Sequence, residues 1–450
     1  MTTEPTTDAT TETTVGTTSE TLDPAEASDQ EGAAPLTGTA APLRPTGWQR
    51  IDPRRYGWWD IFVYAVPVYI VSRLCVLAGA AVVAAEIRVD TNIADDIGLE
   101  TPDPHGAARG NAIRPIVDVL TSWDGKWYME IVRNGYPREI PPNVTYHVDE
   151  ARAAFFPLYP MIARWFDVVL PGGDVAAALA VNIVLGIIAI TLIGVLARRL
   201  YGPAVGRMSV MLAALFPGSF VLSFAYSEAL MLVLAAACLL MLVDREWVAA
   251  GLFAALATAT RPNSVALIVA CAVAAFLAIR ERREYRSLIA VALSPLGFIT
   301  FQLWLGQHAG EMGAWFRVQR EAWGEGASFG WTAVKNTVEA FTNPLTSPTD
   351  TITAICFAAT ILLVYLAWRV RLHWVPFAYS LAVVALMLAP ATVTARPRFM
   401  YAAFPLLIAA AKWYEPHRTR DELIWPLTIG ACGAGLAALT GLYGVFGAIP

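Results

Sequence analysis

The sequence predicts an all-α polytopic membrane protein with about eleven transmembrane helices. Hydrophobic residues make up 56% of the 450 residues and charged residues only 15%, which is too apolar for a set of soluble domains. Apolar stretches recur along the chain, each near the roughly 20 residues that cross a hydrocarbon core. Short clusters of arginine alternate with less basic segments between these stretches, and such clusters are typical of cytoplasmic loops.

The predicted spans run from residue 58 to residue 446. Their approximate bounds are 58–85, 175–197, 204–224, 227–243, 247–260, 262–279, 286–306, 349–368, 374–391, 398–412 and 423–446. Pro262 splits one long apolar run into the fifth and sixth of these spans. A single kinked helix there would turn the arginines of 280–286 and 369–371 outward, against the arginine bias, so we expect two helices.

The N-terminal residues 1–46 are rich in Thr, Ala, Pro and Glu, which predicts a disordered cytoplasmic tail. The tail lacks the basic start and apolar core of a cleavable signal peptide, so the first span should act as both signal and anchor. Arg50, Arg54 and Arg55 would hold the N-terminus inside the cell. Residues 47–450 would then form one transmembrane domain of the cell membrane, with the C-terminus outside.

Two segments between spans are too long to be simple connectors, and the arginine alternation places both outside the cell. The first extracytoplasmic loop covers 86–174 and the second covers 307–348. In the first, apolar residues recur at helical spacing over 116–131 and again over 155–169, which predicts two helices lying on the membrane surface.

In the second loop, Trp315, Gln319 and Trp323 share one helical stripe. Aromatic residues in such a place serve either as anchors at the lipid interface or as substrate contacts, and the pattern leaves both interpretations open.

Asp124 is the strongest candidate for chemistry in the first loop. It follows Ser122 at the predicted start of a surface helix, between Trp123 and Trp127. An acid in a first helical turn often complements the helix dipole. A carboxylate beside tryptophans at a membrane surface is also suited to take a proton from a hydroxyl while the substrate stays anchored in lipid.

Three arginines stand at predicted outward helix ends, where positive charge is unusual: Arg261, Arg396 and Arg398. The forked donors of arginine fit a phosphate group. Arg261 has a second interpretation, as a side chain that snorkels to the interface ahead of a proline-started helix.

Glu228 begins the predicted fourth span after Ser227, so it serves either the helix dipole or substrate binding. Arg73 lies within the first span, where an ionisable group is costly and needs a partner that the sequence does not identify.

Four motifs resemble the PIG-V type of GPI mannosyltransferase and its bacterial relatives. They are Ser122-Trp-Asp-Gly-Lys-Trp-Tyr128 with its continuation to Tyr136, Ala154-Phe-Phe-Pro-Leu-Tyr-Pro160, Ala225-Tyr-Ser-Glu228 and Thr260-Arg-Pro-Asn263. The resemblance covers most of 58–412 and implies membership of the C-type glycosyltransferase (GT-C) superfamily. It implies a catalytic Asp in the first outward loop, here Asp124, and a polyprenyl-phosphate sugar as donor. Gly125 stands where the protein O-mannosyltransferase branch is expected to carry a second acid.

We therefore expect a mannosyltransferase that moves mannose from a polyprenyl-phosphate donor to a lipid-linked or glycan acceptor at the outer face. Asp124 would be the base, and the three arginines would bind the donor phosphate. The expected substrate-binding residues are Trp123, Trp127, Tyr128, Tyr226, Glu228 and Asn263. We expect no cofactor, no metal and, at a formal net charge of −5, no nucleic acid.

Three alternatives remain open at this stage. The sugar on the lipid carrier could be arabinose or glucose, because only the PIG-V likeness favours mannose. A transporter or flippase of lipid-linked sugars would instead place polar groups at both faces and along a central path. A noncatalytic assembly subunit would use the same motifs merely to bind glycolipid.

Overall fold

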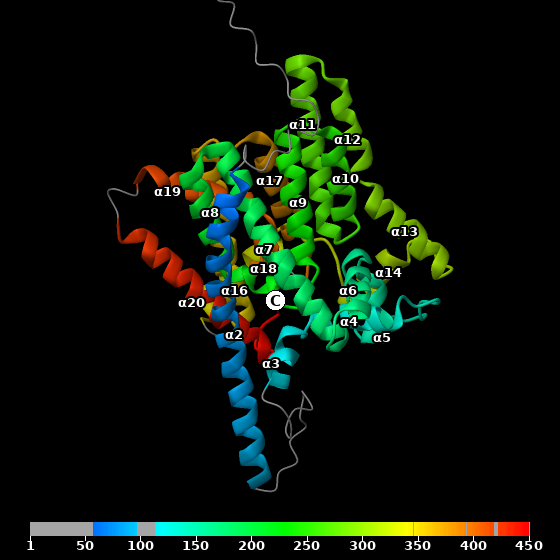
Figure 1. The fold of residues 1–450 in the computed structure, drawn as a ribbon. Helices are drawn as coiled ribbons and strands as arrows, with labels where there is room; N and C mark the ends of the chain where they lie inside the picture. Colours follow the sequence, from blue (N-terminus) through cyan, green and yellow to red (C-terminus); the bar gives the residue numbers. More distant parts are fainter. Residues whose placement is uncertain (1–56, 97–112, 345, 393, 418–421, 450) are drawn as a thin grey trace, which may run out of the picture. The chain divides into compact units, whose positions relative to one another are not determined.

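The computed structural model describes residues 57–96, 113–344, 346–392, 394–417 and 422–449. These residues form helices joined by turns, with one isolated β-bridge between Ala327 and Pro390 (Figure 1). The all-α polytopic fold class is therefore confirmed. The predicted tail 1–46 lies outside the described residues.

Each predicted span coincides with a helix or with a pair of short helices. Among the described residues, six segments are long and apolar enough to cross a membrane: Trp58–Glu86 of α2 (Trp58–Asp96), α7 (Gly173–Tyr201), Pro262–Arg282 with α11 (Ala266–Arg282), Tyr285–His308 with α12 (Leu288–Leu293) and α13 (Leu296–His308), α16 (Pro348–Arg369) and α20 (Ile424–Gly444). Four shorter apolar helices are α8 (Pro203–Leu215), α9 (Glu228–Val243), α10 (Trp247–Thr258) and α17 (Trp374–Leu388). The count of eleven full spans is not confirmed.

Prolines account for most of the breaks inside predicted spans. The predicted span 398–412 is two helices, α18 (Pro397–Ala402) and α19 (Pro405–Tyr414). Pro295 separates α12 from α13, and Pro217 begins the short 3₁₀ helix Pro217–Leu222 that follows α8. A proline has no N–H to donate and clashes with the preceding turn, so an α-helix ends or restarts there.

The fifth and sixth predicted spans are separate antiparallel helices. Trp247 Nε1, at the start of α10, donates a hydrogen bond of 3.0 Å to Glu284 Oε1, just past the end of α11. In one continuous helix these residues would lie about 55 Å apart. The division at Pro262 is thus confirmed.

Ion pairs join the helix ends that carry the arginine clusters. The pairs are Arg198–Asp60 at 3.1 Å, Arg199–Asp244 at 3.0 Å and Arg245–Glu281 at 3.3 Å. They bring the start of α2, the α7–α8 turn, the α9–α10 turn and the end of α11 to one end of the helix bundle, the upper end in Figure 1. Lys412, near the end of α19, donates a hydrogen bond of 2.8 Å to the carbonyl of Val370, which immediately follows α16. This bond joins the C-terminal ends of α19 and α16.

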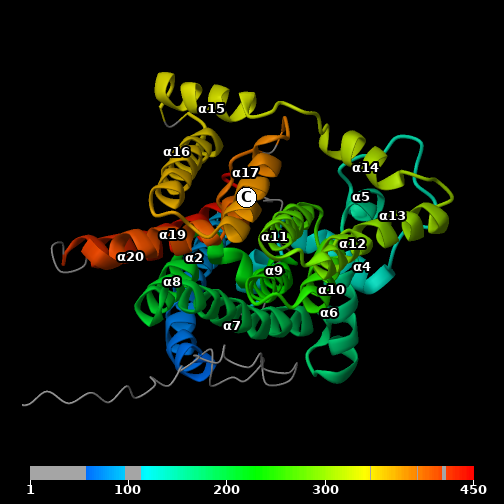
Figure 2. The same cartoon turned by 90° about the horizontal axis from the view of Figure 1, so that it is seen from above.

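The surface helices lie away from this end of the bundle (Figure 1). They are α3 (Ile113–Leu120), which packs against α2, and four helices that gather toward one side of the bundle (Figure 2): α4 (Asp124–Asn134), α5 (Val148–Ala151), α6 (Leu158–Val169) and α14 (Ala314–Trp323). The predicted surface helix over 116–131 is therefore two helices, broken just before Asp124. Trp123 has φ 54° at the break, which no α-helix accommodates.

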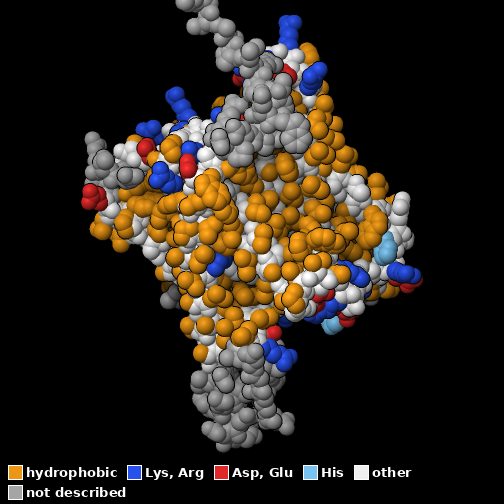
Figure 3. Space-filling view, viewed as in Figure 1, with side chains coloured by type: hydrophobic (Ala, Val, Ile, Leu, Met, Phe, Trp, Pro, Cys, Tyr) orange, Lys and Arg blue, Asp and Glu red, His pale blue; other side chains and the backbone are white. Residues whose placement is uncertain are grey.

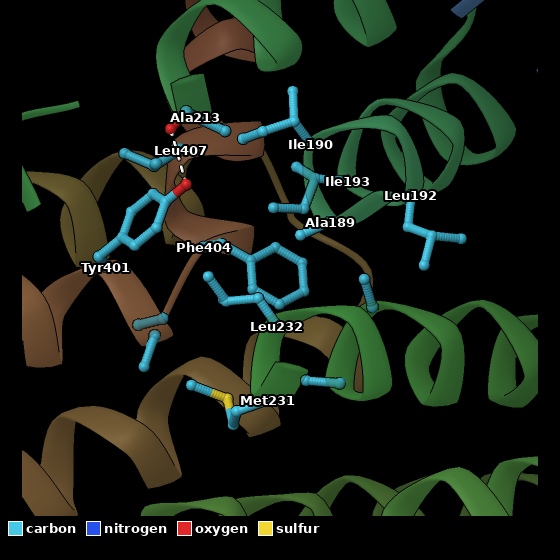
Figure 4. Packing of buried hydrophobic residues seen from close by; sticks show 14 of the residues in the cluster. Ala189, Ile190, Leu192, Ile193, Ala213, Met231, Leu232, Tyr401, Phe404 and Leu407 are labelled. Carbon is cyan, nitrogen blue, oxygen red and sulfur yellow. Dashed lines mark hydrogen bonds between the residues drawn. The ribbon is translucent and has the colours of Figure 1, made fainter. Parts of the chain in front are cut away.

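The core lies among α7, α8, α9 and α19 and consists of closely packed aliphatic and aromatic side chains (Figure 4). Tyr401 donates to the Ala213 carbonyl at 2.8 Å, which satisfies its hydroxyl inside the bundle. Arg73 is satisfied in the same manner, because it donates to Ser219, Ser223 and the Ala214 carbonyl. Hydrophobic side chains cover most of the face shown in Figure 3, as a lipid-facing surface requires.

Candidate active site

Two chain segments far apart in sequence form the floor of the candidate site. The turn that precedes α4 is joined to the loop that precedes α9, because the Ala225 N–H donates to the Leu120 carbonyl at 2.8 Å. Asn182 of α7 holds the same loop by donating to the Tyr226 carbonyl at 2.8 Å. Asp124 and Glu228 each begin the helix that follows, so these contacts fix the two carboxylates relative to each other.

Asp124 lies between two buried arginines. Its Oδ2 accepts a hydrogen bond of 2.7 Å from Arg398 Nη1, and Arg261 Nη2 lies 3.9 Å from the same oxygen. The two arginine side chains are 9% exposed and the Asp124 side chain is 16% exposed. The carboxylate is therefore the more accessible partner in each pair.

Arg261 also pairs with Glu228, at 2.6 Å between Nη1 and Oε2. The same Nη1 donates to Ser227 Oγ at 3.2 Å, and Ser227 Oγ in turn shares a hydrogen bond of 2.5 Å with the Tyr128 hydroxyl. The Ser227 side chain makes no capping bond at the start of α9. It connects Arg261 to Tyr128 instead, and so ties α4 to the end of α10.

Arg396 and Arg398 point to different partners. Arg396 Nη1 donates to the Thr349 carbonyl at 3.0 Å and to Thr353 Oγ1 at 2.8 Å, both on α16, whereas Arg398 reaches Asp124. Residues two apart at the start of a helix do not face each other. The two arginines, both expected to bind the donor phosphate, are both buried but have separate partners.

Several polar atoms of the candidate residues are buried without a hydrogen bond from the described part of the chain. They are Arg261 Nε, Arg396 Nε, Arg398 Nε, Glu228 Oε1, the Tyr226 hydroxyl, Asn263 Oδ1 and Trp127 Nε1. Leaving such an atom unsatisfied costs about 1–3 kcal/mol. The atoms of Arg261 and Arg398 belong to the two side chains that contact Asp124, which favours a place that receives a polar ligand.

The C-terminal helix contributes contacts that the sequence did not indicate. Trp123 Nε1 donates to the Tyr443 carbonyl at 2.9 Å, and the Trp123 ring lies 5.1 Å from that of Phe446. A positive φ at a bulky residue is strained, and these contacts hold it just before Asp124. No motif pointed to Tyr443 or Phe446. Asn182 could have been identified from the sequence as a candidate, because it is a single amide side chain within an apolar span.

Comparison with known proteins adds a family match over part of the chain. The sequence model of the dolichyl-phosphate-mannose-protein mannosyltransferase family matches residues 156–305. This segment contains Glu228 and Arg261 but begins after Asp124 and Gly125, so it does not test the argument drawn from Gly125. None of the curated protein sequences compared with the chain matches it.

Solved structures show a distant likeness. ArnT from Cupriavidus metallidurans in the apo state is 16% identical, with a TM-score of 0.46, over 68% of this chain and 57% of that one. The same protein bound to undecaprenyl phosphate is 12% identical, with a TM-score of 0.45, over 71% and 72% of the two chains.

The archaeal oligosaccharyltransferase AglB from Archaeoglobus fulgidus, in complex with an inhibitory peptide and a dolichol-phosphate, is 13% identical with a TM-score of 0.39. The likeness covers 83% of this chain and 54% of AglB, so the chain spans little more than half of that protein. The family match covers 150 of the 450 residues, one third of the chain, and it identifies neither the PIG-V branch nor the sugar.

Proposed function

We propose that this protein is a mannosyltransferase of the cell membrane that uses a polyprenyl-phosphate mannose donor and a lipid-linked or glycan acceptor. The observation that carries the proposal is the position of Asp124, a partly exposed carboxylate between buried Arg398 and Arg261. A base beside two cations suits a reaction in which a hydroxyl loses a proton while a neighbouring phosphate gains charge.

In the proposed reaction, the acceptor oxygen forms a bond to C1 of the sugar as the bond from C1 to the phosphate oxygen breaks. Asp124 takes the proton of the acceptor hydroxyl. The donor phosphodiester carries one negative charge, and the departing polyprenyl phosphate carries one more. Arg398 and Arg261 would stabilise this additional charge. The family resemblance implies direct displacement with inversion at C1.

The charges at the site favour an anionic ligand. Glu228 offsets Arg261 and Asp124 offsets Arg398. Arg396 forms its hydrogen bonds with uncharged groups of α16 and remains buried. A buried cation of this kind is stabilised when an anion binds near it. Arg396 therefore favours the binding of a donor phosphate at this end of the bundle.

Mannose is favoured by the PIG-V resemblance and by the mannosyltransferase family that matches residues 156–305. Arabinose or glucose on the same kind of carrier is the alternative within this class. Gly125, in the place of a second acid, favours a lipid-linked or glycan acceptor over a protein. Transport of a lipid-linked sugar is less well supported, because the candidate polar groups gather at one end of the bundle.

The test is transfer by the purified chain in lipid nanodiscs. Radiolabelled polyprenyl-phosphate mannose, glucose and arabinose would each be offered with an alkyl mannoside and with a glycolipid extract. We expect a labelled product from mannose with wild type and about 10² to 10⁴ times slower transfer with Asp124→Asn. A product formed only from the glucose or the arabinose donor would identify that sugar as the one transferred, in place of mannose. The absence of product with all three donors would refute the proposed function.

A further inference from the structure

A cluster of four aromatic side chains lies beside Asp124 at the surface end of the bundle. We call Trp127, Tyr146, Phe155 and Trp323 the aromatic rim. The Trp127 ring stacks on Phe155 at 5.5 Å and meets Tyr146 edge-on at 4.7 Å. Trp323 lies 5.3 Å from Tyr146 and 5.8 Å from Trp127, which closes the cluster.

The rim adjoins the candidate base through both sequence and charge. Trp127 follows Asp124 by three positions on α4, so the two side chains share one helix face. Burial raises the pKa of Tyr146 to about 12, and the negative charge of Asp124 adds to this rise. The Tyr146 phenol is therefore within electrostatic reach of Asp124 and stays protonated at ordinary pH.

Exposure differs sharply across the rim. Trp127 is 3% exposed and forms a back wall, and its Nε1 has no hydrogen-bond partner in the described chain. Tyr146 is 50% exposed, so part of its ring is free for a ligand. The cluster thus has an exposed aromatic surface at Tyr146, and behind it the buried N–H donor of Trp127 has no hydrogen-bond partner in the described chain.

The loop that carries Tyr146 is held in place by α14. The Val144 N–H donates to Glu321 at 3.1 Å, and Arg317 donates to the Pro141 carbonyl at 2.9 Å. An ion pair between Arg317 and Glu311, at 2.6 Å, fixes the Arg317 side chain. Tyr146 is therefore presented from a braced loop, as a preorganised binding surface requires.

We propose that the aromatic rim is the acceptor subsite, where Tyr146 and Trp323 pack against the pyranose ring of a glycan acceptor and hold its hydroxyl at Asp124. The inference rests on the proposed function and adds the binding mode of the acceptor. A pyranose ring has a face of C–H groups edged by hydroxyls, which suits an amphipathic aromatic surface with a polar edge. Tyr and Trp also provide such a surface at low cost in conformational entropy.

The competing explanation is that Tyr146 and Trp323 anchor the protein at the lipid interface. Loss of a lipid anchor would affect the stability and membrane insertion of the protein, and it would not change the acceptor KM more than the donor KM. Trp331 of α15 (Trp331–Thr342) is a matched control, because it is an aromatic residue that is 70% exposed and stands outside the rim.

The experiment measures KM for donor and acceptor separately, with the full chain in nanodiscs, polyprenyl-phosphate mannose as donor and octyl α-mannoside as acceptor probe. Tyr146→Ala should raise the acceptor KM about tenfold and change the donor KM less than twofold, since an aromatic contact contributes about 0.5–1.5 kcal/mol. Tyr146→Phe should recover most of the acceptor affinity that Tyr146→Ala loses, because the ring is kept and only the hydroxyl is removed. Trp331→Ala should change neither constant.

An unchanged acceptor KM in a folded Tyr146→Ala protein, or an equal rise in both constants, would overturn the acceptor subsite while leaving the proposed function intact. If wild type transfers no sugar, the proposed function fails, and saturation-transfer NMR with octyl α-mannoside then tests the rim directly. A signal with wild type that Tyr146→Ala loses would sustain the rim as a glycan site. A signal that is absent, or that persists in Tyr146→Ala, would refute it.

Discussion

Arg398 Nη1 donates to Asp124 Oδ2 at 2.7 Å across 274 positions of sequence. The contact joins α18 to the start of α4, so the proposed proton acceptor and the proposed phosphate ligand touch each other. In the proposed reaction, loss of the acceptor proton and departure of the phosphate would then take place next to each other.

Replacing Asp124 with Asn keeps its size and removes its ability to take a proton. We expect transfer to fall by about 10² to 10⁴, the usual contribution of a positioned base. Asp174→Asn is the control, because Asp174 belongs to a surface ion pair with Arg133. Turnover is measured by product formation at saturating substrates. Near-normal turnover in a folded Asp124→Asn protein would exclude Asp124 as the base.

Lysine substitution separates the roles of Arg398 and Arg396. Arg398→Lys should lower the maximal rate by about tenfold or more, because the fork that serves Asp124 and the phosphate is lost. Arg396→Lys should act mainly on donor KM, since Arg396 contacts α16 and not Asp124. Initial rates over a range of donor concentrations distinguish the two effects. Equal and small effects would mark both arginines as structural.

The spans were predictable because hydrophobic length and arginine placement follow directly from the bilayer. Proline explains where the predicted spans 398–412 and 286–306 divide into shorter helices. The count of spans was not predictable, because short apolar helices such as α8 and α9 lie mostly inside the bundle. Their burial depends on tertiary packing, which the local pattern does not contain.

For the candidate site, the sequence identified residue types and the correct end of several helices, but not the pairings. Asp124 and Arg398 meet only because α4 and α18 are brought together by packing. Ser227 immediately precedes α9, a position where a serine side chain often caps the helix, and its side chain instead contacts Arg261 and Tyr128. Such choices between local and long-range partners depend on the fold and leave no periodic signal.

Neutralising Glu228 should destabilise the protein. The Glu228 side chain is 4% exposed beside Arg261, and removing one member of a buried ion pair costs about 3–5 kcal/mol. Glu228→Gln should therefore lower the unfolding temperature, measured in detergent by intrinsic fluorescence. The double variant Glu228→Gln/Arg261→Gln should lose less than the sum of its single variants.

Glu311→Gln provides the comparison for Glu228. Glu311 pairs with Arg317 at the surface, and exposed pairs contribute only about 0–1 kcal/mol. A Glu228→Gln protein as stable as the Glu311→Gln protein would show that the buried pair does not stabilise the bundle.

The orientation of the bundle predicts that Lys126 and Arg282 lie on opposite sides of the membrane. Both side chains are exposed, Lys126 beside Asp124 and Arg282 in an arginine cluster at the other end. Single cysteines at these positions would be introduced after removal of the five native cysteines, Cys75, Cys238, Cys271, Cys356 and Cys432. We expect an impermeant maleimide to label Lys126→Cys in intact cells and Arg282→Cys only after lysis. The reverse pattern would place the site in the cytoplasm.

The last prediction concerns Trp123 as a positioning residue for Asp124. Its Nε1 bond to the Tyr443 carbonyl holds a strained backbone immediately before the base. Trp123→Phe keeps an aromatic ring beside Phe446 but removes the donor. Small displacements of a reacting group are costly, so kcat should fall about tenfold while donor KM stays within twofold.

Trp331→Phe is the matched control for Trp123→Phe, because it makes the same exchange at an exposed position of α15 and should leave kcat unchanged. If the Tyr443 contact serves stability alone, Trp123→Phe will lower the unfolding temperature without changing kcat. That outcome would remove the C-terminal helix from the alignment of the base. A fall in kcat at an unchanged unfolding temperature would instead show that α20 holds Asp124 at the angle that proton transfer requires.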